Sequence, residues 1–299
     1  MLIPKFFMWS ECSFQEYESA CYAFGYNCES SPEFISFKMR NNAALKFYAY
    51  KKKGEILGSV CIENGWVAND YKNPNRELPG LLTPKSSIFV PICSSLKKKV
   101  ILPFRTKCLH PLQQDVFLNT SYNIFNKRHA AFSKNPTIDF SKKTISTRER
   151  EIRKFLDSGG LFMDIDQLTG EHIFKVYETL YEARRNKKIR MPGVNLKFFQ
   201  EFENSFKGHV MFWHGEPIAI QLLLSVSGKA GMFVDFINIG YRKDINAGSL
   251  GTMLMWKNLT ALYQEAAENN LNLYYSYGMM SGEYKTRWCH PVSLGRSII

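Results

Sequence analysis

The second half of the chain carries the pattern that most restricts how it can fold. Apolar runs at 210–213 and 218–225 flank a His-Gly-Glu-Pro turn and predict a β-hairpin. A third apolar run at 231–238 predicts another strand, and apolar residues at helical spacing then predict a long helix over 249–269. A short alternating strand, 273–278, follows. This order predicts a mixed α/β domain.

The first half of the chain shows a related order. Apolar residues at helical spacing predict a helix over 13–24, and Ser31-Pro-Glu is a typical start for a second helix. The runs 47–51 and 56–62, on either side of a Lys-Gly-Glu turn, predict a hairpin. Helices followed by a hairpin thus occur twice, which indicates a duplicated architecture although no letters repeat.

The polar and basic stretch 133–146 separates the two halves. We therefore expect two α/β domains, 1–140 and 141–299. Ser146-Thr-Arg-Glu149 has the pattern of a capping box and predicts that a helix begins there. Asn195 is expected to cap a later helix.

The chain is strongly basic, with a formal net charge of +12. This charge favours an anionic partner, such as an inner-membrane lipid, tRNA or a nucleotide-linked precursor. Ordinary surface lysine is the alternative. Basic clusters at 142–143, 148–154 and 184–190 are candidates for contact with phosphate or an anionic membrane, and solvated helix ends are the favoured alternative for each cluster. No helix-turn-helix pattern is present, so specific DNA binding is not expected.

The cysteine pattern indicates a reducing compartment. Seven cysteines without a Cys-x-x-Cys pair argue against a disulfide framework and a zinc ribbon, and the six histidines have no metal-binding spacing. The first nine residues lack the basic start and cleavage site of a signal peptide. No apolar run reaches the roughly 20 residues that span a bilayer. We expect a cytoplasmic protein, soluble or peripheral to a membrane, without a metal site.

The turn before the long helix is a candidate phosphate site. It contains Arg242, Asn246, Gly248, Ser249 and Gly251. A helix amino terminus offers unpaired N–H groups and positive potential, and glycines allow an anion to approach the backbone. The alternative is a plain strand-to-helix turn capped by Ser249.

Asp235 interrupts an otherwise apolar strand and therefore needs a partner or a role. It is a candidate general base for an attacking amine. A salt bridge to a neighbouring arginine is the alternative.

A compact cluster follows the last predicted strand. Lys285 is a candidate for holding the oxyanion of an acyl-transfer intermediate. Tyr284 and Tyr277 are candidates for proton transfer or for stacking on a substrate, and Glu283 and Arg287 are further candidate substrate contacts. A surface lysine with two packed phenols is the alternative.

Several motifs together resemble the macrophage-inducible antimicrobial-peptide resistance family of enteric bacteria. They are Leu102-Pro103, Asn126-Lys127-Arg128, Phe140-Ser-Lys-Lys143, Arg150-Glu-Ile-Arg-Lys-Phe155, Gly159-Gly160, Glu216-Pro-Ile-Ala-Ile-Gln221, Gly251-Thr252, Trp256 and the segment from Tyr275-Ser-Tyr-Gly278 to Trp288. The resemblance implies a role in surviving cationic antimicrobial peptides, which are further candidate partners. It also implies association with the inner membrane without a spanning helix.

The order of elements also resembles the Gcn5-related N-acetyltransferases, and the terminal Tyr-Lys resembles their Fem-type branch. This resemblance implies tandem acetyltransferase-like domains and transfer of an acyl or aminoacyl group to an amine. The donor would be acyl-coenzyme A or aminoacyl-tRNA. The usual Arg/Gln-x-x-Gly-x-Gly/Ala loop is not met, because Gly248 and Gly251 stand one position too far apart.

These observations lead to one expected function and one rival. We expect an acyl- or aminoacyltransferase that acts on an amine of an envelope component or peptide. Lys285 would stabilise the oxyanion, and Asp235 or Tyr284 would handle the proton. The rival is a non-catalytic regulator that binds a membrane or DNA.

Overall fold

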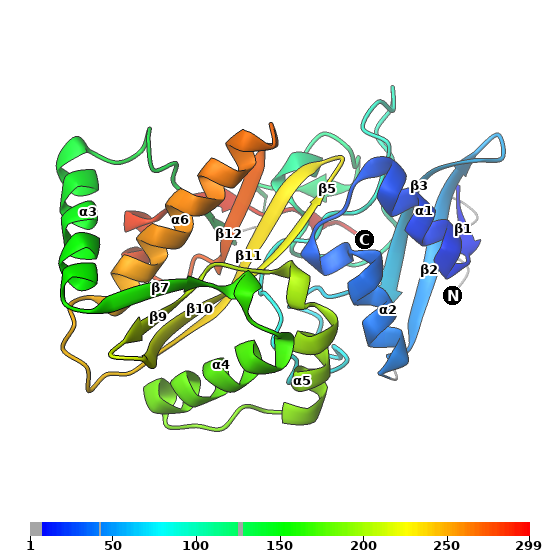
Figure 1. Cartoon of the computed structure of the whole chain (residues 1–299). Helices are drawn as coiled ribbons and strands as arrows, with labels where there is room; N and C mark the ends of the chain where they lie inside the picture. Colours follow the sequence, from blue (N-terminus) through cyan, green and yellow to red (C-terminus); the bar gives the residue numbers. More distant parts are fainter. Residues whose placement is uncertain (1–7, 42, 125–127) are drawn as a thin grey trace.

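The computed structural model describes residues 8–41, 43–124 and 128–299. The first seven residues and the Asn126-Lys127 part of one family motif lie outside this range. Two sheets with helices packed against them lie side by side (Figure 1). The chain thus forms the mixed α/β structure that the sequence predicts.

The N-terminal sheet is small and antiparallel, with strand order β1-β2-β3-β4. Ser13 caps the first helix in a capping box with Glu16, and Ser31 caps the second helix with Pro32 at its first position. The elements are β1 (Trp9–Cys12), α1 (Phe14–Phe24), α2 (Pro32–Arg40), β2 (Leu45–Lys52), β3 (Glu55–Glu63) and β4 (Trp66–Val67).

A long region of turns and isolated bridges follows this sheet up to residue 124. Its regular pieces are short: β5 (Thr120–Ser121) pairs with β14 (Arg296–Ser297) near the end of the chain. Trp9, Leu102, Phe104 and Phe117 belong to the apolar cluster that anchors the region on the N-terminal sheet.

The second sheet has eight strands. Its order is β13-β6-β12-β11-β10-β9-β7, and β8 also pairs with β10. The strands are β6 (His129–Ser133), β7 (Gly160–Asp164), β8 (Phe206–Lys207), β9 (His209–Trp213), β10 (Glu216–Gly228), β11 (Gly231–Tyr241), β12 (Leu273–Met279) and β13 (Cys289–Ser293).

Helices cover both faces of this sheet (Figure 1). Leu222 and Leu224 of β10 pack with α4 (Gly170–Arg185) and α5 (Pro192–Glu201). Leu223, between them, packs with α6 (Leu250–Glu268) on the opposite face, where α3 (Lys142–Asp157) also lies. This alternation follows from the two-residue period of a strand.

Two helix starts differ from the sequence prediction. α3 begins five residues earlier than the capping box predicted, because Ser141 and not Ser146 caps it. Asn195 is not a cap but lies inside α5, where its amide bonds the carbonyl oxygens of Arg190 and Met191.

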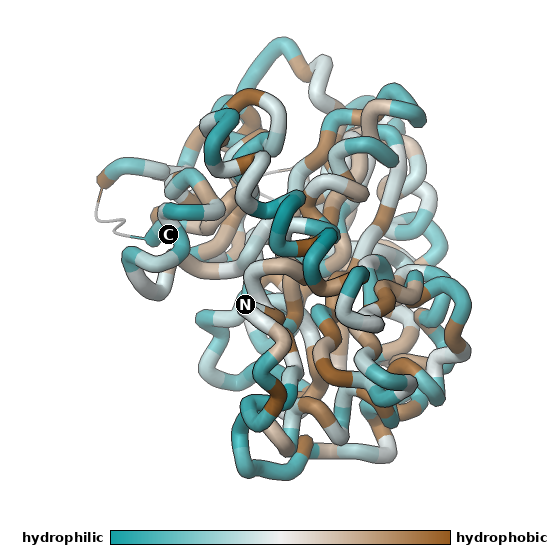
Figure 2. Tube along the Cα trace, turned by 60° about the vertical axis from the view of Figure 1, so that its left-hand side comes forward, coloured by the Kyte–Doolittle hydropathy of each residue, from teal (hydrophilic) through white to brown (hydrophobic). Residues whose placement is uncertain are grey.

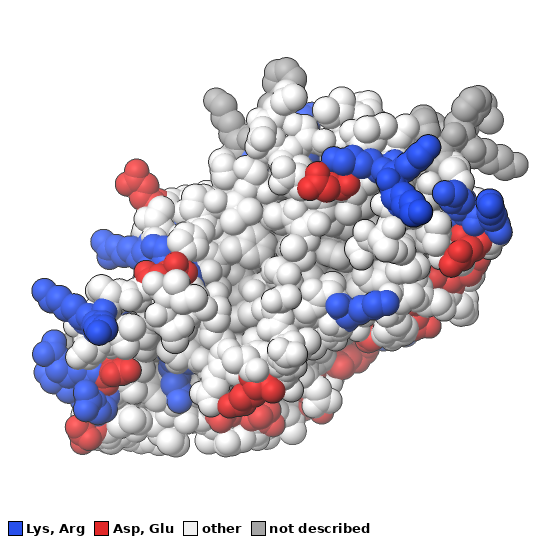
Figure 3. Space-filling model, turned by 90° about the horizontal axis from the view of Figure 1, so that it is seen from above, with Lys and Arg blue, Asp and Glu red and all other residues white. Residues whose placement is uncertain are grey.

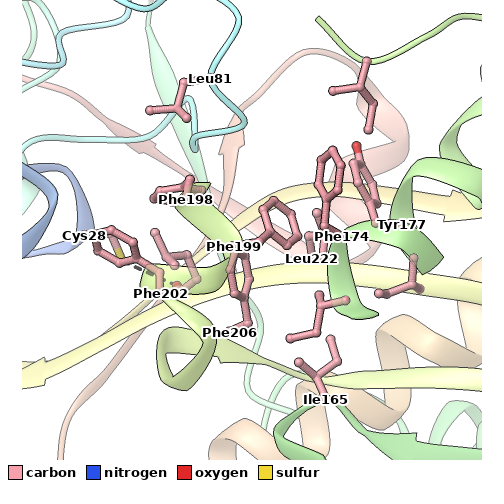
Figure 4. Packing of buried hydrophobic residues seen from close by; sticks show 14 of the residues in the cluster. Cys28, Leu81, Ile165, Phe174, Tyr177, Phe198, Phe199, Phe202, Phe206 and Leu222 are labelled. Carbon is pink, nitrogen blue, oxygen red and sulfur yellow. Dashed lines mark hydrogen bonds between the residues drawn. The ribbon is translucent and has the colours of Figure 1, made fainter. Parts of the chain in front are cut away.

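An aromatic cluster joins the two halves. Phe34 and Phe37 of α2 make edge-to-face contacts with Phe198 of α5 and with Phe202, directly after that helix. Figure 4 shows Cys28 of the first half beside the phenyl rings of α5. Because these rings are buried from both sides, the halves share one core.

β6 precedes the predicted boundary at residue 140 but belongs to the large sheet, between β12 and β13. The sheets therefore do not divide the chain at a single point, and the division into 1–140 and 141–299 stays a prediction.

Apolar residues concentrate in the interior, and the outer turns are mainly hydrophilic (Figure 2). Within the described ranges, no helix has both the length and the apolar character needed to cross a bilayer. Seen from above, charged side chains gather toward the two ends of the molecule, and Lys and Arg alternate with acids at the end where α3 lies (Figure 3). This face thus carries no continuous basic surface.

Candidate active site

A cavity opens where two neighbouring strands diverge. β11 and β12 run parallel and pair from Met232–Leu273 to Asp235–Ser276, and beyond that point their described residues no longer pair with each other. Phe236, Asn238, Ile239 and Tyr241 of β11 and Tyr277 of β12 then line a cavity of about 580 Å³. α6 forms the crossover that a parallel pair requires, so its amino terminus lies at the same edge of the sheet.

The walls of this cavity are cationic. Its lining includes no carboxylate, whereas five basic side chains contribute: Arg184, Arg185, Arg242, Lys243 and Lys285. The cavity therefore favours an anionic ligand.

The α6 amino terminus forms one side. Gly248, Ser249 and Gly251 line the cavity, as does Thr252 in the first turn. Ser249 stands at the cap position but makes no capping bond to the helix, and its hydroxyl donates to Thr252 Oγ1 at 2.8 Å. The structure thus differs from the alternative of a turn capped by Ser249, and first-turn amides stay available to an anion.

Arg242 and Asn246 differ in their placement. Arg242 lines the cavity, but its guanidinium also pairs with Asp244 at 2.5 Å. Asn246 is not among the lining residues.

Arg184 is a lining residue that the sequence did not single out beyond its basic cluster. Its Nη1 donates to the Ile239 carbonyl oxygen at 2.6 Å, and its guanidinium lies 4.8 Å from the centre of the Tyr241 ring. These contacts fix the last turn of α4 against β11. The sequence feature that could have indicated Arg184 as a cavity residue is the Arg184-Arg185 pair at the end of a predicted helix.

Lys285 lies in the short helix η6 (Glu283–Arg287) at the inner side of the cavity. Its Nζ donates to the carbonyl oxygens of Tyr277 and Met279 at 2.7 and 2.6 Å. Burial lowers the pKa of this half-buried amine. An ammonium has three donors, so one stays available for a ligand.

Two phenols flank the lysine. Tyr284 is 65% exposed and lies among the lining residues. Tyr277 is buried, and burial raises its pKa well above the usual value for tyrosine. Its Oη has no hydrogen-bond partner among the described residues. Cys289, which the sequence did not indicate, also lines the cavity, and burial raises the pKa of its thiol to about 12.

The remaining candidates lie apart from this cavity. Asp235 is the last residue of β11 that pairs with β12, is 3% exposed and is not a lining residue. Burial raises its pKa to about 6, and hydrogen bonding from Ser86 and Cys28 acts in the opposite direction. Glu283 and Arg287 are exposed in η6 and do not line the cavity either.

The described residues contain no group of three metal-binding side chains.

Known structures show the same fold over almost the whole chain. FemX is 9% identical and superposes with a TM-score of 0.55, covering 97% of each chain. L-PGS from Bacillus licheniformis is 10% identical with a TM-score of 0.54, covering 96% of this chain and 92% of its own. A conserved protein of unknown function from Bacteroides thetaiotaomicron is 9% identical with a TM-score of 0.53, covering 98% and 100%.

At this low identity the likeness establishes the fold and not the activity. The fold is the tandem acetyltransferase-like, Fem-type arrangement that the sequence predicts. No curated protein matches the chain. The Mig-14 family profile matches residues 33–297, nearly the full length, and confirms the family resemblance. The chain therefore belongs to the Mig-14 family.

Proposed function

We propose that this protein transfers an acyl or aminoacyl group from a phosphate-bearing donor to an amine. The observation that carries this proposal is the cavity between the diverging ends of β11 and β12, with five basic side chains, no carboxylate and the amino terminus of α6 in its walls. Phosphates of the donor meet the cations and the helix terminus. The acyl carbonyl then lies near Lys285.

In the proposed reaction, the role of each residue follows from the atom on which charge develops. The amine nitrogen attacks the donor carbonyl carbon, a C–N bond forms, and the carbonyl oxygen becomes an oxyanion. The third donor of Lys285 stabilises that oxyanion, while its two backbone bonds hold the amine in place. The attacking nitrogen then releases a proton, and collapse of the intermediate breaks the bond to the leaving sulfur or oxygen, which takes up that proton. Tyr284, which lines the cavity, is better placed for this proton than Asp235.

The donor is acyl-coenzyme A or aminoacyl-tRNA. The structural likeness to FemX and L-PGS supports the aminoacyl branch, as does the departure of Gly248 and Gly251 from the usual coenzyme A loop. In this proposal the acceptor is an amine of an envelope component or peptide. The protein works in the cytoplasm at the inner membrane, and the transfer contributes to resistance against cationic antimicrobial peptides.

The test is a thermal-shift and mass-spectrometric screen with acetyl-coenzyme A, longer acyl-coenzyme A species and charged tRNA. One donor should stabilise the protein and leave its group on an amine acceptor. With that donor, Lys285→Ala should lower kcat/KM about 10²–10³-fold, the usual effect of removing an oxyanion donor. Lys229→Ala is the matched control, because Lys229 is exposed at the opposite end of β11.

An unchanged rate in Lys285→Ala would remove the assigned role of Lys285. No transfer with any donor would favour the rival, a binding protein. The engagement of Arg242 by Asp244 is the observation that supports this rival, since it weakens one phosphate contact. Vesicles of anionic lipid and duplex DNA would then be the next probes.

A further inference from the structure

A line of polar side chains crosses an otherwise apolar layer of the large sheet. His209 of β9, Gln221 of β10, Asn258 of α6 and Tyr275 of β12 are all buried. Tyr275 packs with Leu223 and other apolar residues beneath α6. Burying amides and an imidazole here costs free energy unless every polar group is paired.

The pairing is continuous and has a direction. Asn258 Oδ1 lies 2.6 Å from His209 Nδ1, and Asn258 Nδ2 donates to Gln221 Oε1 at 2.8 Å. Gln221 Nε2 then donates to Tyr275 Oη at 3.0 Å. An amide oxygen only accepts, so Nδ1 of His209 carries the proton. Each bond therefore points from the imidazole toward the phenol.

The two ends of this chain lie in different environments. At the outer end, His209 Nε2 lies 2.9 Å from Asp164 Oδ1, and Asp164 is 54% exposed at the edge of a small cavity of about 110 Å³. At the inner end, the rings of Tyr275 and Tyr277 are 4.4 Å apart. Tyr277 lines the cationic cavity and has an unpaired Oη. The hydrogen-bonded chain thus runs from the exposed Asp164 to Tyr275, whose ring contacts Tyr277 in the cavity wall.

The direction depends on the imidazole. When Nδ1 loses its proton, it becomes an acceptor, and the amides of Asn258 and Gln221 must both turn over to keep the chain paired. Gln221 then presents its oxygen to Tyr275, and the phenol must donate to it. In the present arrangement Tyr275 accepts from Gln221 instead, so its own proton is free to face Tyr277.

Several charged groups act on His209. Burial lowers its pKa, and Lys257 acts in the same direction, whereas Asn258, Asp164 and Asp166 act against it. Lys207 and Glu265 also line the small outer cavity, where they form an ion pair. The balance of these groups places the pKa of the imidazole below the usual value for histidine.

We propose that His209, Asn258 and Gln221 are positioning residues for the reaction cavity, and that the protonation state of His209 sets the direction of the Tyr275 hydroxyl beside Tyr277. This inference rests on the proposed function only in taking the cationic cavity as the reaction site. None of the three residues touches that cavity.

The first test does not need activity. The full chain is labelled with ¹³Cζ-tyrosine and ¹⁵N-histidine, and the Tyr275, Tyr277 and His209 resonances are followed by NMR from pH 4.5 to 8. The two tyrosine resonances should shift with the same midpoint as His209. Gln221→Leu should abolish this shared step. Asn195→Ala should keep it, because Asn195 is a buried amide bonded only to the region around α5 and Leu82.

Asp164→Asn tests the same chain of hydrogen bonds at its exposed end, where a substitution is least expected to disturb folding. Loss of the carboxylate removes a group that raises the His209 pKa, so the shared midpoint should move to lower pH. A tyrosine step that persists in Gln221→Leu, or no step in the wild type, would overturn the proposal.

The second test uses the donor from the screen. Gln221→Leu should lower kcat about tenfold, leave KM unchanged and flatten the acidic limb of the pH profile. Asn195→Ala should lower stability and leave both kinetic constants unchanged. If no donor supports transfer while the NMR step is present, the proposed function fails and the network stands.

Discussion

The two halves of the molecule contain related elements but differ in how their strands pair and connect. In the N-terminal half a hairpin continues into turns, and all four strands of its sheet pair antiparallel. In the C-terminal half, α6 connects β11 to a parallel neighbour, and the pair diverges after Asp235. A crossover helix supplies both an opening between strands and a helix terminus beside it. Two cavities that involve the half without such a crossover have carboxylates in their walls, Glu29 in one and Glu18 and Glu33 in the other.

Two lysines, one in each half, also differ in what their side chains bind. Lys38 of α2 is 2% exposed, and its Nζ donates to Glu63 and Asn69, each at 2.7 Å. Lys285 is half-buried and donates only to two backbone carbonyl oxygens. One lysine neutralises a buried carboxylate, and the other keeps a donor and its charge for a ligand.

Replacing each lysine in turn by methionine is the test of this difference with the largest expected effect. Lys38→Met leaves Glu63 buried without its countercharge, and we expect the free energy of unfolding to fall by about 3–5 kcal/mol. Lys285→Met should lower it by only about 2 kcal/mol, since it removes two hydrogen bonds worth about 1 kcal/mol each at a half-buried site. Urea unfolding measures both values. Equal losses would show that the two lysines have the same structural role.

A substitution of Asp235, where β11 and β12 diverge, is a second test of whether a buried ionisable group serves the structure or the reaction. Burial raises its folded-state pKa to about 6, above the unfolded value near 4. The neutral Asp235 carboxyl therefore makes its full contribution to stability below about pH 4, and this contribution is lost as the pH rises through about 6. Asp235→Asn should remove the loss and gain up to about 3 kcal/mol at pH 7, at 1.36 kcal/mol per pKa unit.

Urea unfolding at pH 4 and pH 7 checks this difference. With Asn in place of Asp235, the transfer rate should change by less than about threefold, because the side chain does not line the cavity. A large loss of rate would instead restore Asp235 as the general base.

The smallest effect concerns the α6 amino terminus. Thr252→Asp places a carboxylate in its first turn, which favours the helix dipole but repels a phosphate. We expect about tenfold weaker donor binding, or about 1.4 kcal/mol, by calorimetry with the donor that the screen identifies. Thr144→Asp is the matched control in the first turn of α3, which is outside the cavity lining. Equal binding by both variants would remove the phosphate role of the α6 terminus.

The local elements of the second half could be predicted from the sequence because each follows from a short period. The alternation in β10, β11 and β12 and the cap position of Ser249 needed no distant contact. The start of α3 was wrong because Ser141 and Ser146 offer similar caps. The packing of Ile145 and Ile152 beneath α6 is consistent with the earlier start.

The site was less predictable because its members come together through tertiary contacts. Lys285, Tyr284 and Gly248 were identified from a local cluster and a helix start, and the cavity contains all three. Arg184 enters the cavity only because α4 packs on β11, and His209 meets Asn258 across 49 positions. No local pattern marks such pairs.

The position of β6 has a consequence for synthesis of the chain. This strand lies between β12 and β13, and both partners are translated 140 or more positions after it. A chain emerging from the ribosome must therefore hold residues 129–133 with both backbone edges unpaired until its last segment arrives. Exposed strand edges invite pairing with other chains. Expression of the first half alone should thus yield aggregates, and the complete protein should depend on a chaperone or on rapid elongation while it is being made.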